Sequence, residues 1–214
     1  MQHLLLSLLL ACVVVPAQER PNVILVMADD LGWGDLACFG HPDVLTPHLD
    51  ALADDGLRFT RFHAAAPVCS PTRASCLTGR HPYRAGIPGA NTGHLRDDEF
   101  TLQDLLGKAG YRTGHFGKWH LGVLSKTLRD SNRGGPRGAA HFAPPWLRGF
   151  DVCFSTEAKV PTFDPMKDPK RDQHYGTHYW NQQGELVTDN LAGDDSRVIM
   201  DRVLPFVRDA VADV

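Results

Sequence analysis

The sequence has little of three things that would assign it to a specialised class: cysteine, net charge and long apolar segments. Five cysteines in 214 residues are too few for a disulfide scaffold. The net charge of -3 leaves no electrostatic footprint for nucleic acid, so no nucleic-acid partner is expected. There is no Asn-x-Ser/Thr glycosylation sequon. With 43% apolar residues, the chain can bury the core of one globular domain.

The longest apolar stretch, residues 4–15, lies near the N-terminus and is too short to span a bilayer. Val15-Pro16-Ala17 then offers the small residues of a cleavage site, so we predict a signal peptide over residues 1–17 and a secreted or periplasmic protein. The alternative is a lipoprotein box, Leu9-Leu10-Ala11-Cys12, which would anchor the chain through Cys12. We expect no stable membrane span.

Strand and helix signals alternate along the rest of the chain. Residues 22–28 form a continuous apolar run, typical of a strand buried on both faces of a parallel sheet. Thr46-Pro47 predicts a helix start, and Gly56 predicts its end. The other expected elements are strands at 57–62 and 111–116 and helices at 101–109 and 194–211, the last kinked at Pro205. This alternation predicts an α/β fold with a mainly parallel sheet flanked by helices.

Two stretches rich in Gly, Pro or Arg, residues 129–145 and 159–172, are expected to be surface loops. Loops of this length are often functional. His174 and His178 have the i, i+4 spacing of metal ligands, but Gly176 between them disfavours a helix. Structural or substrate-loop roles are therefore the favoured interpretation of these two histidines.

The most specific pattern begins at Cys69. Cys69-Ser70-Pro71-Thr72-Arg73 is followed at fixed spacing by Leu77-Thr78-Gly79-Arg80. Because Pro71 suits the first turn of a helix, Cys69 is expected at a helix N-terminus, where unpaired N–H groups favour an anion. Arg73, one turn further on, adds a permanent positive charge with several donors.

Adjacent carboxylates, Asp29 and Asp30, follow the predicted strand at 22–28. Ligands of open α/β sheets bind beyond the carboxyl ends of the strands. Two like charges side by side suggest a bound cation, and carboxylate oxygens select hard metals such as Ca²⁺ or Mg²⁺. Taken alone, the pair would instead indicate a solvated turn or a helix cap.

A second pattern, GYRTGHFGKWH, occupies residues 110–120. Alternation along an extended segment places Lys118 and His120 on one face. A surface lysine and a core histidine at a strand end are the alternative interpretation. His115 is expected to be structural.

Together these motifs resemble the two signatures of the sulfatase family, C-x-P-x-R with L-T-G-R, and G-Y-x-T-x-x-x-G-K-x-x closing with Lys-x-His. The resemblance implies an alkaline-phosphatase-like α/β fold and a sulfuric ester hydrolase. It implies that a formylglycine-generating maturation enzyme oxidises Cys69 to an aldehyde, whose hydrate attacks sulfur and then expels sulfate. Lys118 would neutralise sulfate oxygens and His120 would hydrogen-bond the diol, with Arg73 as a further catalytic residue. Asp29, Asp30 and the modified Cys69 would bind the metal, usually Ca²⁺.

The implied substrates are sulfated small molecules or glycans, as for arylsulfatases and N-acetylgalactosamine-6-sulfatase-like enzymes. Two alternatives stay open, a phosphoester or phosphonate monoester hydrolase of the same superfamily and an inactive glycan-binding pseudoenzyme. Family members complete the site with an Asp-Asn pair, a His and a Lys far downstream of the second signature. Asp189-Asn190 precedes the last predicted helix and does not fit that pair. Residues 18–214 are thus expected to be the N-terminal part of a catalytic domain, truncated and inactive alone.

Overall fold

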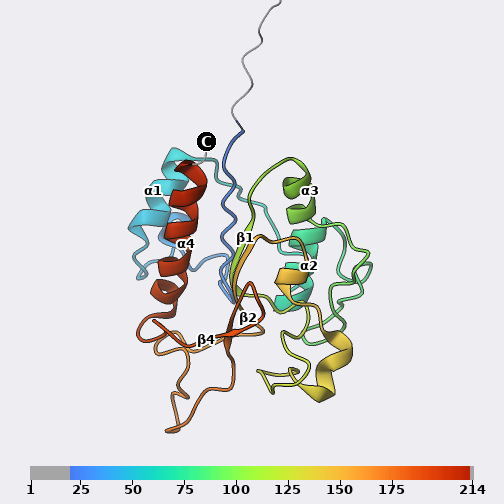
Figure 1. Ribbon diagram of the computed structural model, residues 1–214. Helices are drawn as coiled ribbons and strands as arrows, with labels where there is room; N and C mark the ends of the chain where they lie inside the picture. The colour runs from blue at the N-terminus through green and yellow to red at the C-terminus, as the bar shows by residue number, and fades with distance from the viewer. Residues whose placement is uncertain (1–19, 213–214) are drawn as a thin grey trace, which may run out of the picture.

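The computed structural model describes residues 20–212, so the predicted signal peptide and the alternative lipid anchor at Cys12 lie outside the described residues. No helix in the described range is both long and apolar enough to cross a membrane. Figure 1 shows the elements, with 3-10 helices denoted η. In chain order they are η1 (Ala37–Phe39), α1 (Pro47–Asp55), α2 (Cys69–Thr78), α3 (Leu102–Lys108), β1 (Gly114–Lys118), η2 (Pro136–His141), η3 (Pro145–Leu147), β2 (Val152–Thr156), β3 (Tyr179–Asn181), β4 (Leu186–Val187) and α4 (Asp195–Ala212).

The four strands form one sheet in the order β1-β2-β3-β4. β1 and β2 are parallel, with Lys118 opposite Thr156, whereas β3 and β4 are added antiparallel. A tight hairpin joins β3 to β4 and turns at Gly184, whose φ of 73° is accessible to glycine without strain. The expected α/β class is confirmed, with a mixed sheet among the described residues.

Helices cover both faces of this sheet (Figure 1). On one face, Val198 of α4 is buried against Phe154 and Tyr179. On the other face, Ala74 of α2 belongs to a larger cluster of buried apolar residues that includes Trp119. Burying a large apolar side chain stabilises a fold by roughly 1.5–3 kcal/mol, so these two clusters fix the position of β1.

The expected helices are confirmed because their end signals are local. α1 begins after Thr46, and Gly56 ends it. α3 begins with a reciprocal capping box between Thr101 and Asp104. α4 is continuous from Asp195 to Ala212, with Pro205 inside the helix.

Two of the expected strands are wrong. Residues 22–28 are extended but pair with no strand in the described part of the chain, and Val26 is 86% exposed. Residues 57–62 likewise form no strand, and Leu57 is 80% exposed. An apolar pattern favours extended backbone, but a strand also needs a neighbour to take its N–H and C=O groups. The third expected strand, at 111–116, is confirmed with shifted bounds, because β1 aligns with β2 from Gly114 to Lys118.

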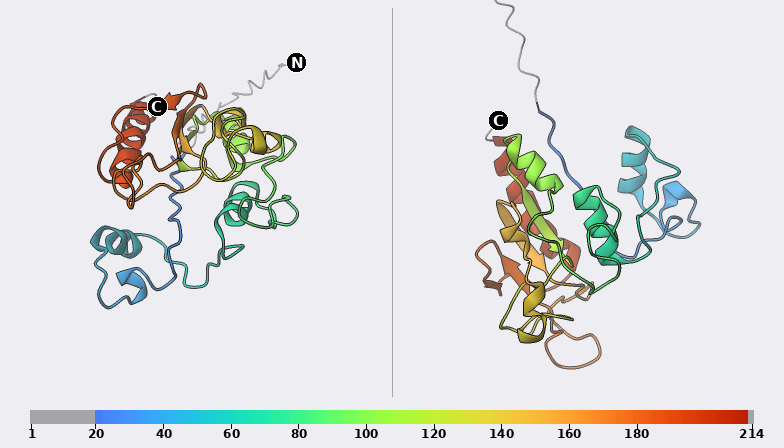
Figure 2. Two further views of the ribbon diagram at one scale, coloured as in Figure 1. Left: turned by 90° about the horizontal axis from the view of Figure 1, so that it is seen from below. Right: turned by 90° about the vertical axis from the view of Figure 1, so that its right-hand side faces the viewer.

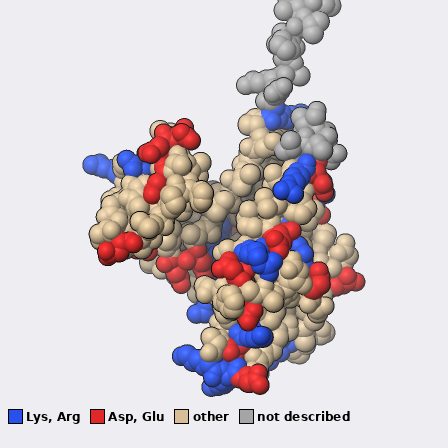
Figure 3. Space-filling model, turned by 90° about the vertical axis from the view of Figure 1, so that its left-hand side faces the viewer, with Lys and Arg blue, Asp and Glu red and all other residues tan. Residues whose placement is uncertain are grey.

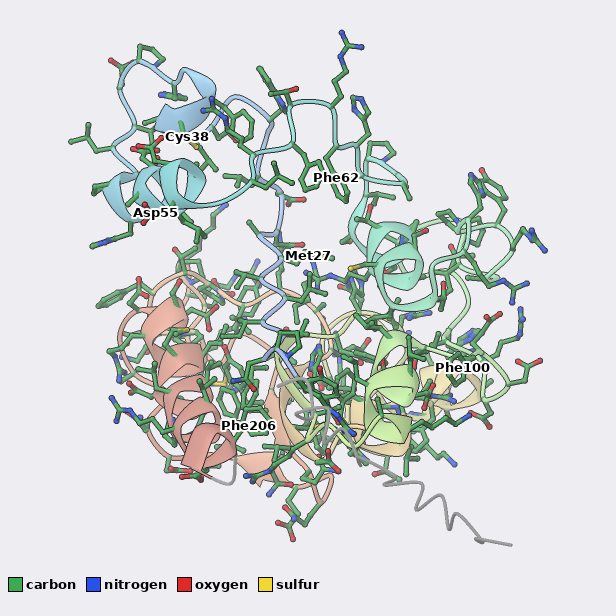
Figure 4. All side chains as sticks on the ribbon, turned by 90° about the horizontal axis from the view of Figure 1, so that it is seen from above. Met27, Cys38, Asp55, Phe62, Phe100 and Phe206 are labelled. Carbon is green, nitrogen blue, oxygen red and sulfur yellow. The ribbon has the colours of Figure 1, made fainter. Side chains whose placement is uncertain are left out.

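A small lobe formed by η1 and α1 stands apart from the sheet (Figures 2 and 3). Polar contacts hold it together: the amide of Cys38 donates to Asp50 at 2.9 Å, and that of Ala37 donates to Thr46 at 3.0 Å. α1 has no buried residue. Figure 4 shows Met27 on the extended segment that passes between this lobe and the sheet.

Candidate active site

Cys69 is the first residue of α2, as predicted from Pro71. It is half-buried, and its thiol is free. The preceding residue, Val68, has extended backbone angles and offers no side-chain cap to the helix. The first-turn N–H groups of α2 therefore face the surroundings of Cys69, and such groups attract an anion.

Arg73 joins α2 to the end of β1 and to the extended segment. Its guanidinium donates to the carbonyl oxygen of Lys118 at 2.5 Å and to the carboxylate of Asp29 at 3.2 Å. The Lys118 ammonium donates to the other Asp29 oxygen at 2.7 Å. The structure thus brings together three of the predicted site residues from segments far apart in sequence.

The charges in this cluster shift the pKa of Asp29. Burial raises that pKa, but the hydrogen bond from Lys118 and the charges of Lys118 and Arg73 outweigh burial, so the pKa lies below its ordinary value. Two cations face one carboxylate. The cluster therefore carries an excess positive charge suited to an anionic substrate group.

His120 lies two residues beyond β1 and is only 4% exposed. Its Nε2 is 2.9 Å from Oδ1 of Asn91, while its Nδ1 has no partner among the described residues. Burial lowers the pKa of His120 to about 4, with further lowering by the charges of Lys118, Arg133 and Arg73. The imidazole is thus neutral at physiological pH, donates from Nε2 to Asn91 and keeps an accepting lone pair on Nδ1.

Asn91 is a site residue that the sequence did not reveal. It follows a Gly-Ala turn and reaches His120 across 29 positions of the chain. Both residues have left-handed backbone angles, with φ of 59° for Asn91 and 55° for His120. A lone Asn before Thr and Gly indicates only a turn, so no local signal could have assigned it to the site.

Asp30 also has a left-handed φ, of 55°, and is exposed. Adjacent carboxylates fit a hard divalent cation by donor type. Within residues 20–212, however, no group of three or more His, Cys, Asp or Glu side chains is arranged to hold a metal ion. Asp29 and Asp30 therefore supply at most part of the ligand set, because Ca²⁺ takes about 6–8 oxygens.

The other histidines discussed from the sequence, His115, His174 and His178, have structural contacts. Nδ1 of His115 is 2.7 Å from the Ser155 hydroxyl, which agrees with the structural role expected for it. The rings of His174 and His178 stack at 4.5 Å, and the Gly176 amide donates to Nδ1 of His174. These contacts favour the structural interpretation of the pair.

The Asp189-Asn190 pair is also engaged away from the cluster at Asp29. Asp189 accepts a hydrogen bond from Arg202 of α4 at 3.0 Å. Asn190 donates to Asp201 of the same helix at 2.9 Å. Both contacts support the interpretation that this pair is not a metal ligand pair.

Comparison with known proteins shows the family of this chain. Residues 21–209 match the family model described as Sulfatase. The chain belongs to the sulfatase family. Human arylsulfatase A is 48% identical over 145 residues, which cover 65% of this chain and 26% of arylsulfatase A. This sulfatase chain therefore spans about a quarter of the length of that curated relative.

Solved structures agree on the fold. The crystal structure of Ps i-CgsB matches with a TM-score of 0.71 and 28% identity, covering 91% of this chain and 42% of that one. The structure of BT4656 in complex with its substrate D-glucosamine-2-N,6-O-disulfate matches with a TM-score of 0.63 and 25% identity, covering 89% of this chain and 31% of that one. The expected alkaline-phosphatase-like α/β fold is confirmed.

Proposed function

We propose that the protein hydrolyses sulfate esters of glycans or other small molecules, using a formylglycine made from Cys69 and a divalent metal. The observation that carries the proposal is the contact of Arg73 and Lys118 with Asp29 beside the helix that begins at Cys69. Membership of the sulfatase family and the likeness to BT4656, solved with a disulfated sugar, support it.

Arg73 and Lys118 are the groups that would bind the sulfate. Their side chains are each 13% exposed, so their charges are only weakly screened by water. Arg73 lies one turn after Cys69 on α2, which keeps its guanidinium on the same side of the helix. Both cations would stabilise negative charge on the sulfate oxygens as the ester bond breaks.

His120 is suited to take a proton. Its neutral ring offers the Nδ1 lone pair, and its hydrogen bond to Asn91 fixes which nitrogen carries the proton. Asp29 and Asp30 would hold a Ca²⁺ or Mg²⁺ ion together with the modified Cys69. The formylglycine would supply an oxygen nucleophile in place of a thiol, and the metal would withdraw charge from that oxygen.

We also propose a maturation partner, a location and a place in the catalytic domain for this protein. A formylglycine-generating enzyme is the maturation partner, and the protein is secreted or periplasmic through a signal peptide at residues 1–17. Residues 18–214 belong to the N-terminal part of the catalytic domain.

The test begins with mass spectrometry of the Cys69 peptide from protein made with the maturation enzyme. We expect an aldehyde at residue 69 and, when residues 18–214 are joined to the remainder of the catalytic domain, turnover of an aryl sulfate in preference to the matching aryl phosphate. Cys69→Ser should become sulfated and then stop, because a single hydroxyl can attack sulfur but cannot expel the sulfate.

Cys38→Ser is the matched control, because Cys38 is another half-buried free cysteine, located in the lobe formed by η1 and α1. It should leave aryl sulfate turnover unchanged. Steady multiple turnover by Cys69→Ser would refute the formylglycine mechanism. Preferred turnover of the aryl phosphate would instead establish the phosphoester or phosphonate hydrolase alternative.

A further inference from the structure

The loop at residues 129–141 forms a basic pocket that the proposed chemistry does not use. The pocket has a volume of about 410 Å³. Its lining includes three arginines and a histidine but no carboxylate; the residues are Arg129, Ser131, Asn132, Arg133, Gly134, Arg137, Gly138 and His141. We call this the arginine pocket.

Two glycines allow the loop to fold tightly around the arginine pocket. A Cβ on Gly138 would meet the carbonyl oxygen of Arg133 at 1.8 Å. A Cβ on Gly134 would meet the backbone oxygen of Asp130 at 2.7 Å. The close backbone approaches bring Arg129, Arg133 and Arg137 to one cavity although they are spread over nearly ten residues.

The positive charge of the arginine pocket is not neutralised by ion pairs. None of its three arginines forms a salt bridge with another residue of the described range. The buried carboxyl group beneath the loop, Glu157, accepts from the Arg133 amide at 3.2 Å. Burial raises the pKa of Glu157 to about 8, with a further rise from the charge of Asp130, so Glu157 is mostly uncharged at pH 7.

A chain of contacts joins the arginine pocket to the candidate active site. Asn132 donates to Oδ1 of Asn91 at 3.4 Å, and the same oxygen lies 2.9 Å from Nε2 of His120. Arg133 donates to the carbonyl oxygen of Gly93 at 2.8 Å, which ties the loop to the turn that carries Asn91. These contacts place the arginine pocket next to the turn that positions His120.

We propose that the arginine pocket is a second anion-binding subsite, which holds an acidic group of the substrate other than the sulfate being removed. The ligand is a sulfate or carboxylate on a glycan, because the planar fork of arginine matches both groups and glycans are the class of substrate that carries several of them. Ser131 and Asn132 add uncharged donors to the lining. This inference rests on the proposed function and defines its substrate class as polyanionic glycans.

The test measures binding, so that it does not depend on turnover. Protein with unmodified Cys69 is titrated calorimetrically with three disaccharides: one with a single sulfate ester, one with a second sulfate on the neighbouring sugar, and one with a carboxylate at that place. We expect at least one of the two doubly acidic probes to bind about tenfold more tightly than the single sulfate, since charge-assisted hydrogen bonds are the strong ones. The tighter of the two identifies the acid.

Arg129→Gln combined with Arg137→Gln should abolish this preference and leave the affinity for the single sulfate unchanged. Both side chains are exposed, so the fold should tolerate the change. The matched control removes two exposed arginines elsewhere, Arg171→Gln with Arg208→Gln, and should keep the preference.

Equal affinities for all three probes, or a preference that survives the pocket double variant, would overturn the subsite. Failure of the proposed function is distinguishable from either result. An aryl sulfate carries no second acid, so lack of aryl sulfate turnover by aldehyde-bearing protein that includes the remainder of the catalytic domain rejects the hydrolase and leaves the binding result intact.

Discussion

The two sides of the candidate active site are held in place by different forces. Arg73 and Lys118 lie on α2 and β1, and Trp119, which is 1% exposed, packs in the core between Lys118 and His120. Asp29 follows an extended segment whose apolar side chains are exposed. Packing fixes the cationic side, whereas polar contacts fix the carboxylate side.

The carboxylate side is held by only a few polar contacts. Besides the contacts of Asp29, two hydrogen bonds hold the start of the extended segment: the Tyr111 hydroxyl donates to the carbonyl oxygen of Pro21 at 3.0 Å, and the Arg20 guanidinium donates to the carbonyl oxygen of Ala109. Partly exposed ion pairs stabilise by about 0–1 kcal/mol each, far less than the buried clusters. The position of Asp29 therefore depends on the charges it meets and on any cation it binds.

The largest expected effect contrasts a packed side chain with an exposed one. Phe154→Ala should lower the free energy of unfolding by about 3–5 kcal/mol, because Phe154 is 4% exposed and its ring stacks on Tyr179 at 4.3 Å. Val26→Ala should change it by less than about 0.5 kcal/mol. Urea unfolding of the 214-residue chain measures both. Equal losses would mean that residues 22–28 are packed in solution.

The next largest effect is a pH dependence of the free energy of unfolding, caused by Glu157 on the packed side. Because burial raises the pKa of Glu157 to about 8, the folded protein keeps a proton that the unfolded chain releases above about pH 4.5. The resulting stability is fully present below pH 4.5 and is lost as the pH rises to about 8. Between these pH values the free energy of unfolding should fall by an amount on the order of 3 kcal/mol because of Glu157, and Glu157→Gln should remove this fall.

Urea unfolding of both proteins at pH 5 and pH 8 tests this. The free energy of unfolding of the native protein should fall more steeply between the two pH values than that of Glu157→Gln. Glutamine keeps the acceptor for the Arg133 amide, so the comparison isolates the proton. Parallel pH dependences would show that Glu157 titrates near its ordinary pKa.

The smallest expected effect concerns the carboxylate side. Asp29→Asn should weaken Ca²⁺ or Mg²⁺ binding by about tenfold or more, because an amide replaces an anionic ligand. The circular dichroism of the sheet and helices should not change, since Asp29 contributes nothing to either buried cluster. Asp43→Asn, on another exposed residue, is the control for calorimetric titration of the metal. Unchanged affinity in Asp29→Asn would place the metal elsewhere.

The sequence predicted the helices because their end signals are local, and the resemblance to the sulfatase signatures pointed to Arg73 and Lys118 as candidate site residues. Thr101 and Asp104 cap α3 with side chains three positions apart, and Cys69 with Arg73 needs one helical turn. Strands depend on partners, so the apolar run at 22–28 predicted extended backbone but not its exposure. The arginine pocket was foreseen only as a loop, because its cavity depends on close backbone contacts at Gly134 and Gly138.

The left-handed backbone of Asp30, Asn91 and His120 also limits how this site can evolve. Among residues other than glycine, Asn, Asp and His accept such angles most readily, while β-branched and bulky residues are strongly disfavoured there. During evolution, substitutions at these positions among Asn, Asp and His would disturb the backbone little. Glutamate for Asp30 or glutamine for His120 would preserve polarity yet disturb the backbone, so mutational drift at these positions is confined to a narrow set of residues.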